Sequence, residues 1–299
     1  MDNRLYDFSP IPERAPLVWP NGARVAFYVG LNIEHFELGP PSTSIWEGTA
    51  QLALDPLNHG WRDYGLRVGF WRLLESLDRH GVRASVLLNS DVADRYPQVI
   101  EAGRRREWAW LAHGKTNSRL HINLAEGEER RLLTEMSETI ERVTGQRPRG
   151  WMGPGLTETS ETPRLLAELG FSYLLDWTAD DQPFALNVPG LISVPYSVEL
   201  NDIILFLARG FTGEDFYRAV VDQFNQLLLD SSQSGRVMAL ALHPFVIGQA
   251  FRAGYLERTL AYIANHDDVW LATSDEIAEA YLAQVRHPLS SAEDAQASR

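Results

Sequence analysis

The sequence has no cysteine among its 299 residues, so neither a disulfide nor a thiolate-bound metal can form. A metal would have to be held by histidine and by carboxylate or amide oxygens. Long apolar runs are also missing, since no stretch reaches the roughly 18 residues that favour a membrane-spanning helix. The first 20 residues are polar and rich in proline rather than built like a signal peptide. We therefore expect a cytoplasmic protein.

Basic residues are in deficit. The chain has 27 lysines and arginines against 40 aspartates and glutamates, which gives a formal net charge of -13. A surplus of negative charge repels nucleic acids and anionic membrane surfaces. We expect neither as a partner, and a small neutral or zwitterionic molecule is the easier substrate to accommodate.

The hydrophobic content of 44% is enough for one large core, and a single α/β domain commonly fills this length. Residues 1–21 contain Pro10, Pro12, Pro16 and Pro20, which favour an extended N-terminal arm. We expect the domain over residues 22–286 and a disordered tail over 287–299, where serine and alanine are frequent.

Apolar runs of strand length alternate with segments of helical periodicity along the domain. This alternation predicts parallel strands with helices outside them. The segment from Glu34 to Tyr64, with Gly39-Pro40-Pro41, has little periodicity, and we expect it to cover a site as a lid. The predicted strands cover 25–31, 84–88, 108–112, 149–152, 171–175, 192–196, 237–242 and 269–272, and the predicted helices cover 66–81, 92–105, 127–143, 162–169, 214–229 and 256–263, with a last helix from Asp275.

Polar motifs follow three of the predicted strands: Asn32-Ile33-Glu34, His113-Gly114-Lys115-Thr116-Asn117 and Leu242-His243-Pro244. The carboxyl ends of parallel strands are where catalytic groups collect in wound α/β folds. The three motifs would bring one carboxylate and two imidazoles to one rim. This combination indicates a hydrolase.

Glu34, His113 and Asn117 could together hold a divalent metal such as zinc. Catalytic zinc sites usually take three strong ligands and leave a fourth position for water, and an amide oxygen is a weak ligand. The alternative is that His113 is a buried histidine bonded to a carbonyl group and that Asn117 caps the next turn. On these residues alone, the alternative is favoured over a bound metal.

His243 is fixed at the rim because the following Pro244 disfavours helical geometry for the residue before it. An imidazole can protonate a leaving nitrogen when a C–N bond breaks. Asp176, which follows the strand over 171–175, is the carboxylate that we expect to orient the other ring nitrogen. The alternative is a structural histidine with satisfied hydrogen bonds.

Aromatic and polar residues follow the later strands. Rings beside carboxylates and amides suit a sugar or a flat ureide, whose faces stack while hydrogen bonds fix the edges. Packing in the core is an equal alternative for Trp151 and Tyr196. The candidate substrate-binding residues of this group are Trp151, Trp177, Asp180, Tyr196 and Asn201.

At this point the motifs resemble a known family. The segments Asn32-Ile33-Glu34, His113 to Asn117, Arg147 to Trp151, Asp176-Trp177 and Leu242-His243-Pro244 follow the order and approximate spacing of the five motifs of the polysaccharide deacetylases, the NodB-like carbohydrate esterases. Within that family, Asp63-Tyr64-Gly65, Gly69-Phe70-Trp71-Arg72, Gly150-Trp151 and Asn201-Asp202 resemble the metal-independent allantoinase branch, near the cyclic-imide hydrolases.

The resemblance implies a distorted (β/α)₇ barrel that hydrolyses a non-peptide C–N bond. It places Glu34 on the family's metal-binding aspartate, and His113 and Asn117 on its two metal-binding histidines. Asp176 falls on the aspartate of the fourth motif and His243 on the general acid.

Two departures bear on the mechanism. Asn32 stands where the family has its catalytic base, and Met152 stands where it has the arginine that supports this base. An amide cannot accept a proton from water at useful cost. We therefore expect a changed mechanism in which Glu34 activates water and His243 protonates the leaving nitrogen, while Asn32 and Asn117 hydrogen-bond the substrate.

A metal-poor site favours ring opening of a cyclic amide, ureide or imide, because a strained ring amide needs less polarisation than an acetamide. Cofactors are then none, or a weakly held divalent metal. The alternatives are a metal-assisted N-deacetylase of an acetylated sugar and a catalytically silent barrel that binds a carbohydrate or ureide. We also expect a homodimer or homotetramer.

Overall fold

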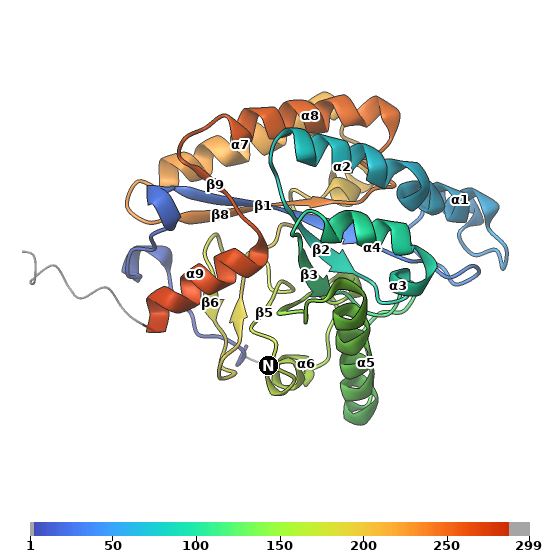
Figure 1. Ribbon diagram of the computed structural model, residues 1–299, viewed down its shortest axis with the longest axis horizontal. Coiled ribbons are helices and arrows are strands. Elements are labelled where there is room, and N and C mark those ends of the chain that lie inside the picture. Colours follow the sequence, from blue (N-terminus) through green and yellow to red (C-terminus); the bar gives the residue numbers. More distant parts are fainter. Residues whose placement is uncertain (1–2, 287–299) are drawn as a thin grey trace, which may run out of the picture.

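Nine strands form one curved sheet, and helices cover its outer face (Figure 1). In this computed structural model, which describes residues 3–286, the strand order is β6-β7-β5-β4-β3-β2-β1-β8, with β9 beside β1. The strands are β1 (Val25–Ile33), β2 (Ala84–Leu88), β3 (Ala109–Ala112), β4 (Gly150–Trp151), β5 (Tyr173–Leu174), β6 (Phe184–Ala185), β7 (Ile192–Ser193), β8 (Arg236–Leu242) and β9 (Val269–Leu271).

The wall of the barrel consists of parallel strands. Among residues 3–286, the one antiparallel pair is β6 with β7, and β9 adds to the first residues of β1. Beyond β7, an isolated parallel bridge between Asn201 and Ala241 joins the chain to β8 at the other end of the sheet. This bridge brings the two ends of the open sheet together, and the predicted single-domain α/β fold of the distorted-barrel type is confirmed.

Helices follow most of the strands, as the alternating sequence pattern predicts. In Figure 1, α7, α8 and α2 lie over β1 and β8, and α5 lies lower in the view and contacts β3. None of the helices within residues 3–286 is both long and apolar enough to cross a membrane. The helices are α1 (Pro56–Tyr64), α2 (Phe70–Arg79), α3 (Val92–Arg95), α4 (Pro97–Arg104), α5 (Glu126–Thr144), α6 (Thr162–Glu168), α7 (Gly213–Asp230), α8 (Ala250–Ala264) and α9 (Ser274–Arg286).

Several elements differ from the predictions: β6 was not predicted, and α8 begins six residues before the predicted start at Leu256. Two further differences have a clear physical cause. The helix predicted over 92–105 is two helices, α3 and α4, because Tyr96 leaves helical geometry (φ -134°, ψ 58°) directly before Pro97. The segment predicted to be an irregular lid contains α1, whose first turn is capped by Asp55 through the backbone N–H of Asn58 at 3.2 Å. Pro56 at the first helical position supports the same start.

The N-terminal arm lies against the barrel of its own chain. Arg14 forms a two-pronged ion pair with Asp180, at 2.8 and 2.5 Å. Further along, the indole of Trp19 is buried and donates to the carbonyl oxygen of Arg236 at 2.8 Å. These contacts fix the arm. The tail predicted over 287–299 lies outside the described residues.

Strand β1 shows how the fold positions the site. Phe27 and Val29 point outward into the core beneath the helices, whereas Ala26 and Tyr28 belong to the cluster that fills the barrel interior. Side chains alternate along a strand, so the even-numbered positions face inward. Glu34 continues that series one position beyond the end of β1, and it therefore lies at the mouth of the barrel.

Candidate active site

The same alternation of side chains shows which of the other candidate residues face the interior of the barrel. In β2, β3 and β8 the odd-numbered residues Leu87, Leu111 and Ala241 pack in the interior. The next odd-numbered positions, Asn89, His113 and His243, consequently reach the inner rim beside Glu34.

Trp151 has the opposite orientation and packs in the outer core, where Leu174 also lies. Two residues beyond Leu174, Asp176 shares that outward series. The alternation of side chains along the strands thus directs Trp151 and Asp176 outward. Glu34, His113 and His243 point inward and meet at the mouth.

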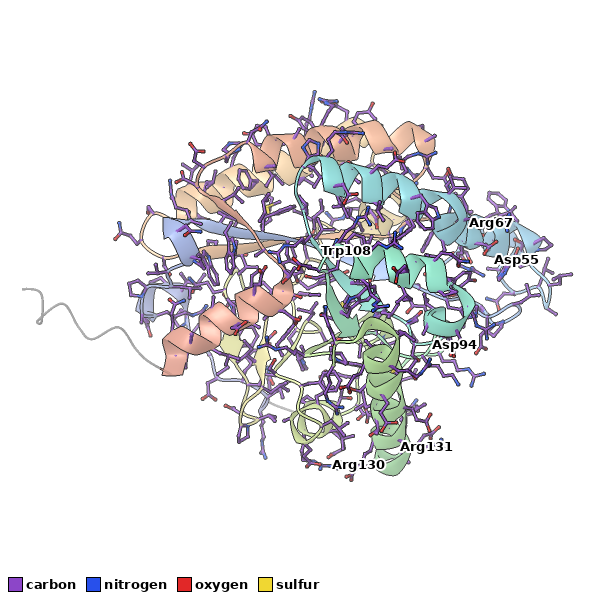
Figure 2. All side chains as sticks on the ribbon, viewed as in Figure 1. Asp55, Arg67, Asp94, Trp108, Arg130 and Arg131 are labelled. Atoms are coloured by element: carbon purple, nitrogen blue, oxygen red, sulfur yellow. The ribbon has the colours of Figure 1, made fainter. Side chains whose placement is uncertain are left out.

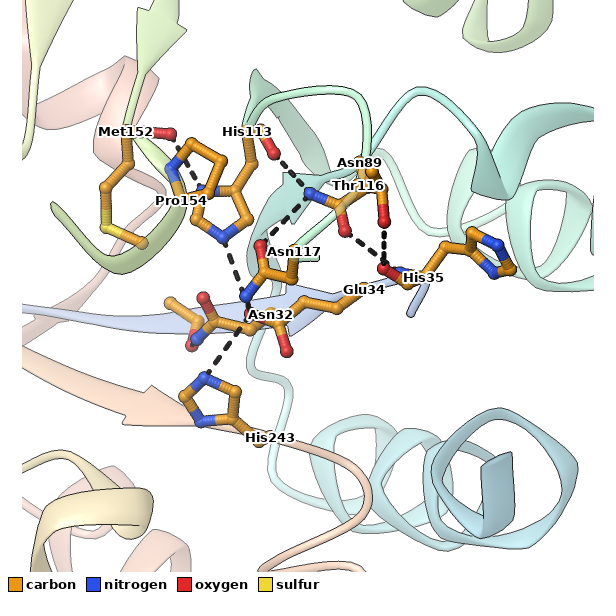
Figure 3. Close-up of polar contacts among 12 residues, drawn as sticks. Asn32, Glu34, His35, Asn89, His113, Thr116, Asn117, Met152, Pro154 and His243 are labelled. Carbon is orange, nitrogen blue, oxygen red and sulfur yellow. Dashed lines mark hydrogen bonds and ion pairs between the residues drawn. The ribbon is translucent and has the colours of Figure 1, made fainter. Parts of the chain in front are cut away.

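Glu34 lies at the centre of the cluster (Figure 3). Its Oε1 is 3.4 Å from Nε2 of His113 and 3.7 Å from Nε2 of His243, and it accepts a hydrogen bond from the side-chain amide of Asn117. The other oxygen, Oε2, is buried without a hydrogen-bond partner in the described part of the chain. Glu34 thus holds one oxygen in place and keeps the second available.

His113 is held by the main chain. Its Nδ1 lies 2.7 Å from the carbonyl oxygen of Met152, which can only accept, so Nδ1 carries the proton and Nε2 presents a lone pair. The alternative predicted from the sequence, a buried histidine bonded to a carbonyl group, describes this contact correctly. It does not account for Nε2, which faces Glu34.

His243 is paired with Asp202. Its Nδ1 is 2.6 Å from Oδ1 of Asp202, and Oδ2 of the same carboxylate accepts the backbone N–H groups of His243 at 2.8 Å and Ile247 at 3.2 Å. Burial lowers the pKa of His243, but the charges of Asp202 and Glu34 and the hydrogen bond to Asp202 outweigh it, and the net pKa is raised. The imidazole is therefore suited to carry a proton at neutral pH.

Asp176 is not the partner of His243, so that prediction is wrong. Its Oδ1 accepts the backbone N–H of Gly153 at 2.7 Å, and its pKa is raised well above the ordinary range by burial and by the charge of Glu158. Glu158 in turn accepts from the indole of Trp177 at 2.9 Å, and burial raises its pKa to about 7. Asp176 and Trp177 belong to this second acidic group.

Asn89 is a site residue that the sequence analysis missed. Its Oδ1 accepts the backbone N–H of His35 at 2.9 Å, and its Nδ2 donates to the carbonyl oxygen of His113 and to Oδ1 of Asn117. One fully buried side chain thus ties the ends of three segments together (Figure 3). The signal was present, because Asn89 directly follows the predicted strand over 84–88.

Asn32 and Tyr196 lie deeper, inside the barrel. The amide of Asn32 donates to the hydroxyl of Tyr196 and to the carbonyl oxygen of Leu242, both at 3.2 Å. Beside them, Met152 is buried in the same interior cluster. The positions where the family has a charged base and an arginine are therefore filled by neutral side chains, and the amide N–H groups of Asn32 are used within the protein.

The remaining candidates make contacts elsewhere. Trp151 is fully buried with its ring edge toward His121, at a centroid distance of 5.1 Å, so packing rather than substrate contact describes it. Asp180 anchors the arm through Arg14, and Asn201 accepts the backbone N–H of Ile203 at 3.0 Å. A cavity of about 840 Å³ lies beneath the arm and is lined by Asp180 and Tyr196, but not by Glu34.

The predicted metal ligands do not form a complete set. Asn117 turns its NH₂ group toward Glu34 and its oxygen toward Asn89, an assignment set by the hydrogen-bond network. That leaves Glu34 and His113 as strong donors, whereas open zinc sites generally use three. Within residues 3–286, no group of three His, Asp or Glu side chains is placed to hold a metal. We derive no catalytic step through a metal.

A carboxylate between two imidazoles, at the mouth of a wound α/β barrel, is the arrangement of a hydrolase that works by acid–base chemistry. Known proteins of similar sequence and structure belong to the same class. The family model for polysaccharide deacetylases matches residues 62–174. A Schizosaccharomyces pombe protein assigned to the polysaccharide deacetylases is 25% identical over 306 residues, covering 90% of this chain and 93% of the relative.

Two solved structures extend the likeness to nearly the whole chain. One, described as a polysaccharide deacetylase from Pseudomonas aeruginosa PAO1, is 28% identical with a TM-score of 0.79 and covers 91% of this chain and 94% of its own. The Puue allantoinase is 25% identical with a TM-score of 0.82 and covers 95% and 100%. The chain is thus similar to polysaccharide deacetylases over most of its length, and this likeness and the site together indicate a hydrolase that acts on carbon–nitrogen bonds.

Proposed function

We propose that this hydrolase opens the ring of a cyclic amide, ureide or imide, with Glu34 as the base and His243 as the general acid. The observation that carries the proposal is the position of Glu34 Oε1, at 3.7 Å from Nε2 of a His243 whose Nδ1 is bonded to Asp202. A likeness to an allantoinase structure over 95% of the chain supports the choice of substrate class.

In this mechanism, Glu34 takes a proton from water while the water oxygen forms a bond to the ring carbonyl carbon. The carbonyl electron pair moves onto its oxygen and returns as the C–N bond breaks. His243 then gives its Nε2 proton to the departing nitrogen, which would otherwise leave as an unstable anion. The proton on Glu34 can pass to His243, and the product acid loses its own proton to water, which restores both groups.

In this series of proton transfers, Asp202 fixes the tautomer of His243. A carboxylate at Nδ1 keeps the exchangeable proton at Nε2, where it faces Glu34, and stabilises the imidazolium. Because the net pKa of His243 is raised, the protonated form that a general acid needs is favoured. Asp202 is therefore a positioning residue, and it takes the role that the sequence analysis predicted for Asp176.

A ring substrate suits this site better than an acetylated sugar. The positions of the family's base and its arginine partner are neutral, and of the three predicted metal ligands two, Glu34 and His113, are strong donors. A strained or electron-poor ring carbonyl needs less polarisation than a plain acetamide, and Glu34 and His243 supply the two proton transfers that ring opening requires.

The first test is a substrate screen on protein purified without added metal. Allantoin, hydantoin, succinimide and N-acetylglucosamine oligomers would be compared with and without a chelator. We expect turnover of at least one ring substrate that chelator leaves unchanged. Near-stoichiometric zinc, lost together with deacetylation of the sugar, would establish the metal-assisted deacetylase instead.

The second test uses variants. We expect Glu34→Gln and His243→Asn each to lower kcat by about 10²–10⁴-fold, the usual contribution of a positioned acid or base. Arg67→Gln, on an exposed side chain, is the matched control and should keep wild-type activity. Unchanged turnover in both variants, with folding intact, would contradict the assignment. No turnover by the wild type, but ring binding, would favour the silent barrel.

The proposal also covers the location and the oligomeric state of the enzyme. We propose a cytoplasmic enzyme that forms a homodimer or homotetramer. The proposed assembly is supported by several exposed apolar side chains on the segment before α1 and at its start, since a cluster of such side chains at one place marks an interaction site. Sedimentation or light scattering would test the assembly. The exposed side chains are Leu38, Ile45, Trp46, Leu52, Leu54 and Leu57.

A further inference from the structure

Arg62, on helix α1, is a buried arginine without a carboxylate partner. Only 7% of its surface is exposed, and its Nε makes no hydrogen bond to any described residue. One of its other nitrogens, Nη1, donates to the carbonyl oxygen of Thr43 at 2.7 Å. The one carboxylate that raises its pKa is Asp55, which is already bonded to Asn58 as the helix cap. Burial outweighs that contribution, and the pKa of Arg62 is lowered.

An unpaired buried guanidinium is costly. Removing a charge from water without a counter-charge costs several kcal/mol, and native proteins normally pair such groups. The ring of Phe36, 5.0 Å from the Cζ atom of Arg62, offers a cation–π contact that offsets part of this cost. The buried Nε has no hydrogen-bond partner among the described residues, so its position calls for another explanation.

Arg62 and Glu34 line the same cavity. This cavity has a volume of about 20 Å³ and is also bordered by His59, Asp63 and Tyr96. A space of that size holds about one water molecule. The unpartnered Oε2 of Glu34 and the unpartnered Nε of Arg62 are therefore two opposite charges beside one water-sized space next to the proposed reaction centre.

Ring opening places a negative charge in this region. Water that is activated by Glu34 supplies an oxygen that ends in the carboxylate of the product. Because that oxygen starts beside Glu34, the new carboxylate forms next to the same cavity. Arginine recognises carboxylates well, since its planar N–H groups match their geometry.

We propose that Arg62 binds the carboxylate oxygen formed on ring opening, and that it selects ring-opened products and similar carboxylates over neutral analogues. This inference rests on the proposed function. It gives α1 a specific role. Arg62 supplies a positive charge to a rim where this chain has Met152 in place of the family's arginine. Arg62 acts here as a specificity-determining residue, and Glu34 and His243 remain the groups that transfer protons.

The test compares ligands that differ only in charge. Succinamate, the ring-opened form of succinimide, and its neutral amide, succinamide, would be titrated into the full chain by calorimetry. The proteins would be the wild type, Arg62→Gln, Arg62→Lys and Arg67→Gln. Arg67 is the matched control, because its side chain is 74% exposed at the end of the molecule that carries α1 (Figure 2).

We expect the wild type and Arg67→Gln to bind succinamate at least about tenfold more tightly than succinamide. Arg62→Gln should lose this preference, whereas Arg62→Lys should keep part of it. If Arg62 only holds Thr43 in place, Arg62→Gln will weaken both ligands equally, and that result would overturn the inference. A wild type that prefers neither ligand would overturn it as well.

Turnover of succinimide and hydantoin by the wild type, measured in parallel, separates the two claims. Turnover without a charge preference refutes the role of Arg62 and leaves the proposed function standing. A charge preference that depends on Arg62, without turnover of any ring substrate, refutes the proposed function and supports a carboxylate site at this cavity. Thermal unfolding of each variant confirms that the folded protein is being compared.

Discussion

Asp202 and Asp176 are two carboxylates of the same barrel that differ in their hydrogen-bond partners. Asp202 meets an imidazole and two backbone N–H groups. Asp176 meets one backbone N–H group and the carboxyl group of Glu158, which is itself partly buried. Both aspartates were within reach of the sequence motifs, yet only Asp202 lies beside the histidine that can act as an acid.

The neighbouring group of each aspartate determines its chemical role. Beside His243, the charge of Asp202 favours the imidazolium, so the pKa of the histidine rises and a proton is kept ready at the mouth. On the other side, burial and the charge of Glu158 raise the pKa of Asp176, and burial and the charge of Glu129 raise the pKa of Glu158. The first pair supports proton transfer, and the second holds protons in place.

The largest expected effect separates the two aspartates by activity. We expect Asp202→Asn to lower kcat by about 10²–10⁴-fold, because the amide no longer fixes the tautomer or stabilises the imidazolium of His243. Asp176→Asn should change kcat far less, since an amide can still accept the N–H of Gly153. Steady-state kinetics on the ring substrate that the wild type opens would measure both.

The pH profile of Asp202→Asn is the control. A general acid is active below its pKa, so the wild-type rate should fall as pH rises through the raised pKa of His243. In the variant this fall should begin at lower pH. Equal losses in the two variants, with an unshifted profile, would show that Asp202 and Asp176 do not differ in function.

The next prediction concerns the contribution of hydrogen bonds around each aspartate's site to the free energy of unfolding. Asn89→Ala should lower the free energy of unfolding by about 3 kcal/mol, because it leaves three buried polar groups around His35, His113 and Asn117 without their partner. Trp177→Phe removes one hydrogen bond to Glu158 and should cost about 1 kcal/mol. Urea unfolding would measure both. A larger loss in the tryptophan variant would reverse this order.

The sequence predicted much of this fold, because alternating apolar runs and helical segments are local signals. Strand 84–88 matches β2 in both bounds, and Glu34, His113 and His243 do meet at the mouth. Strand parity was harder to read. The parallel strands are apolar on both faces, so their sequences do not show which side faces inward. That ambiguity allowed Asp176, on the outward series, to be chosen.

Asp202 could not have been assigned by parity, because it does not follow directly on a strand. Its position depends on the parallel bridge between Asn201 and Ala241, which closes the sheet and sets Asp202 one residue from the level of His243. Contacts of this kind join residues far apart in the chain and have no local pattern. Arg62 was hidden for another reason, since the Asp55-Pro56 helix start within the expected lid went unrecognised.

The smallest effect tests the proton held on the Asp176 side. The pKa of Glu158 is raised from 4.5 to about 7, so between these values the folded protein binds more protons than the unfolded chain. Stability from this group is therefore present below pH 4.5 and is lost as pH rises to about 7. Glu158→Gln stays neutral, and it should be more stable than the wild type at pH 8, by on the order of 2 kcal/mol, but not at pH 4. Urea unfolding at the two pH values would measure the difference. An equal difference at both would mean that Glu158 is ionised throughout, and the contrast between the two aspartates would then rest on Asp202 alone.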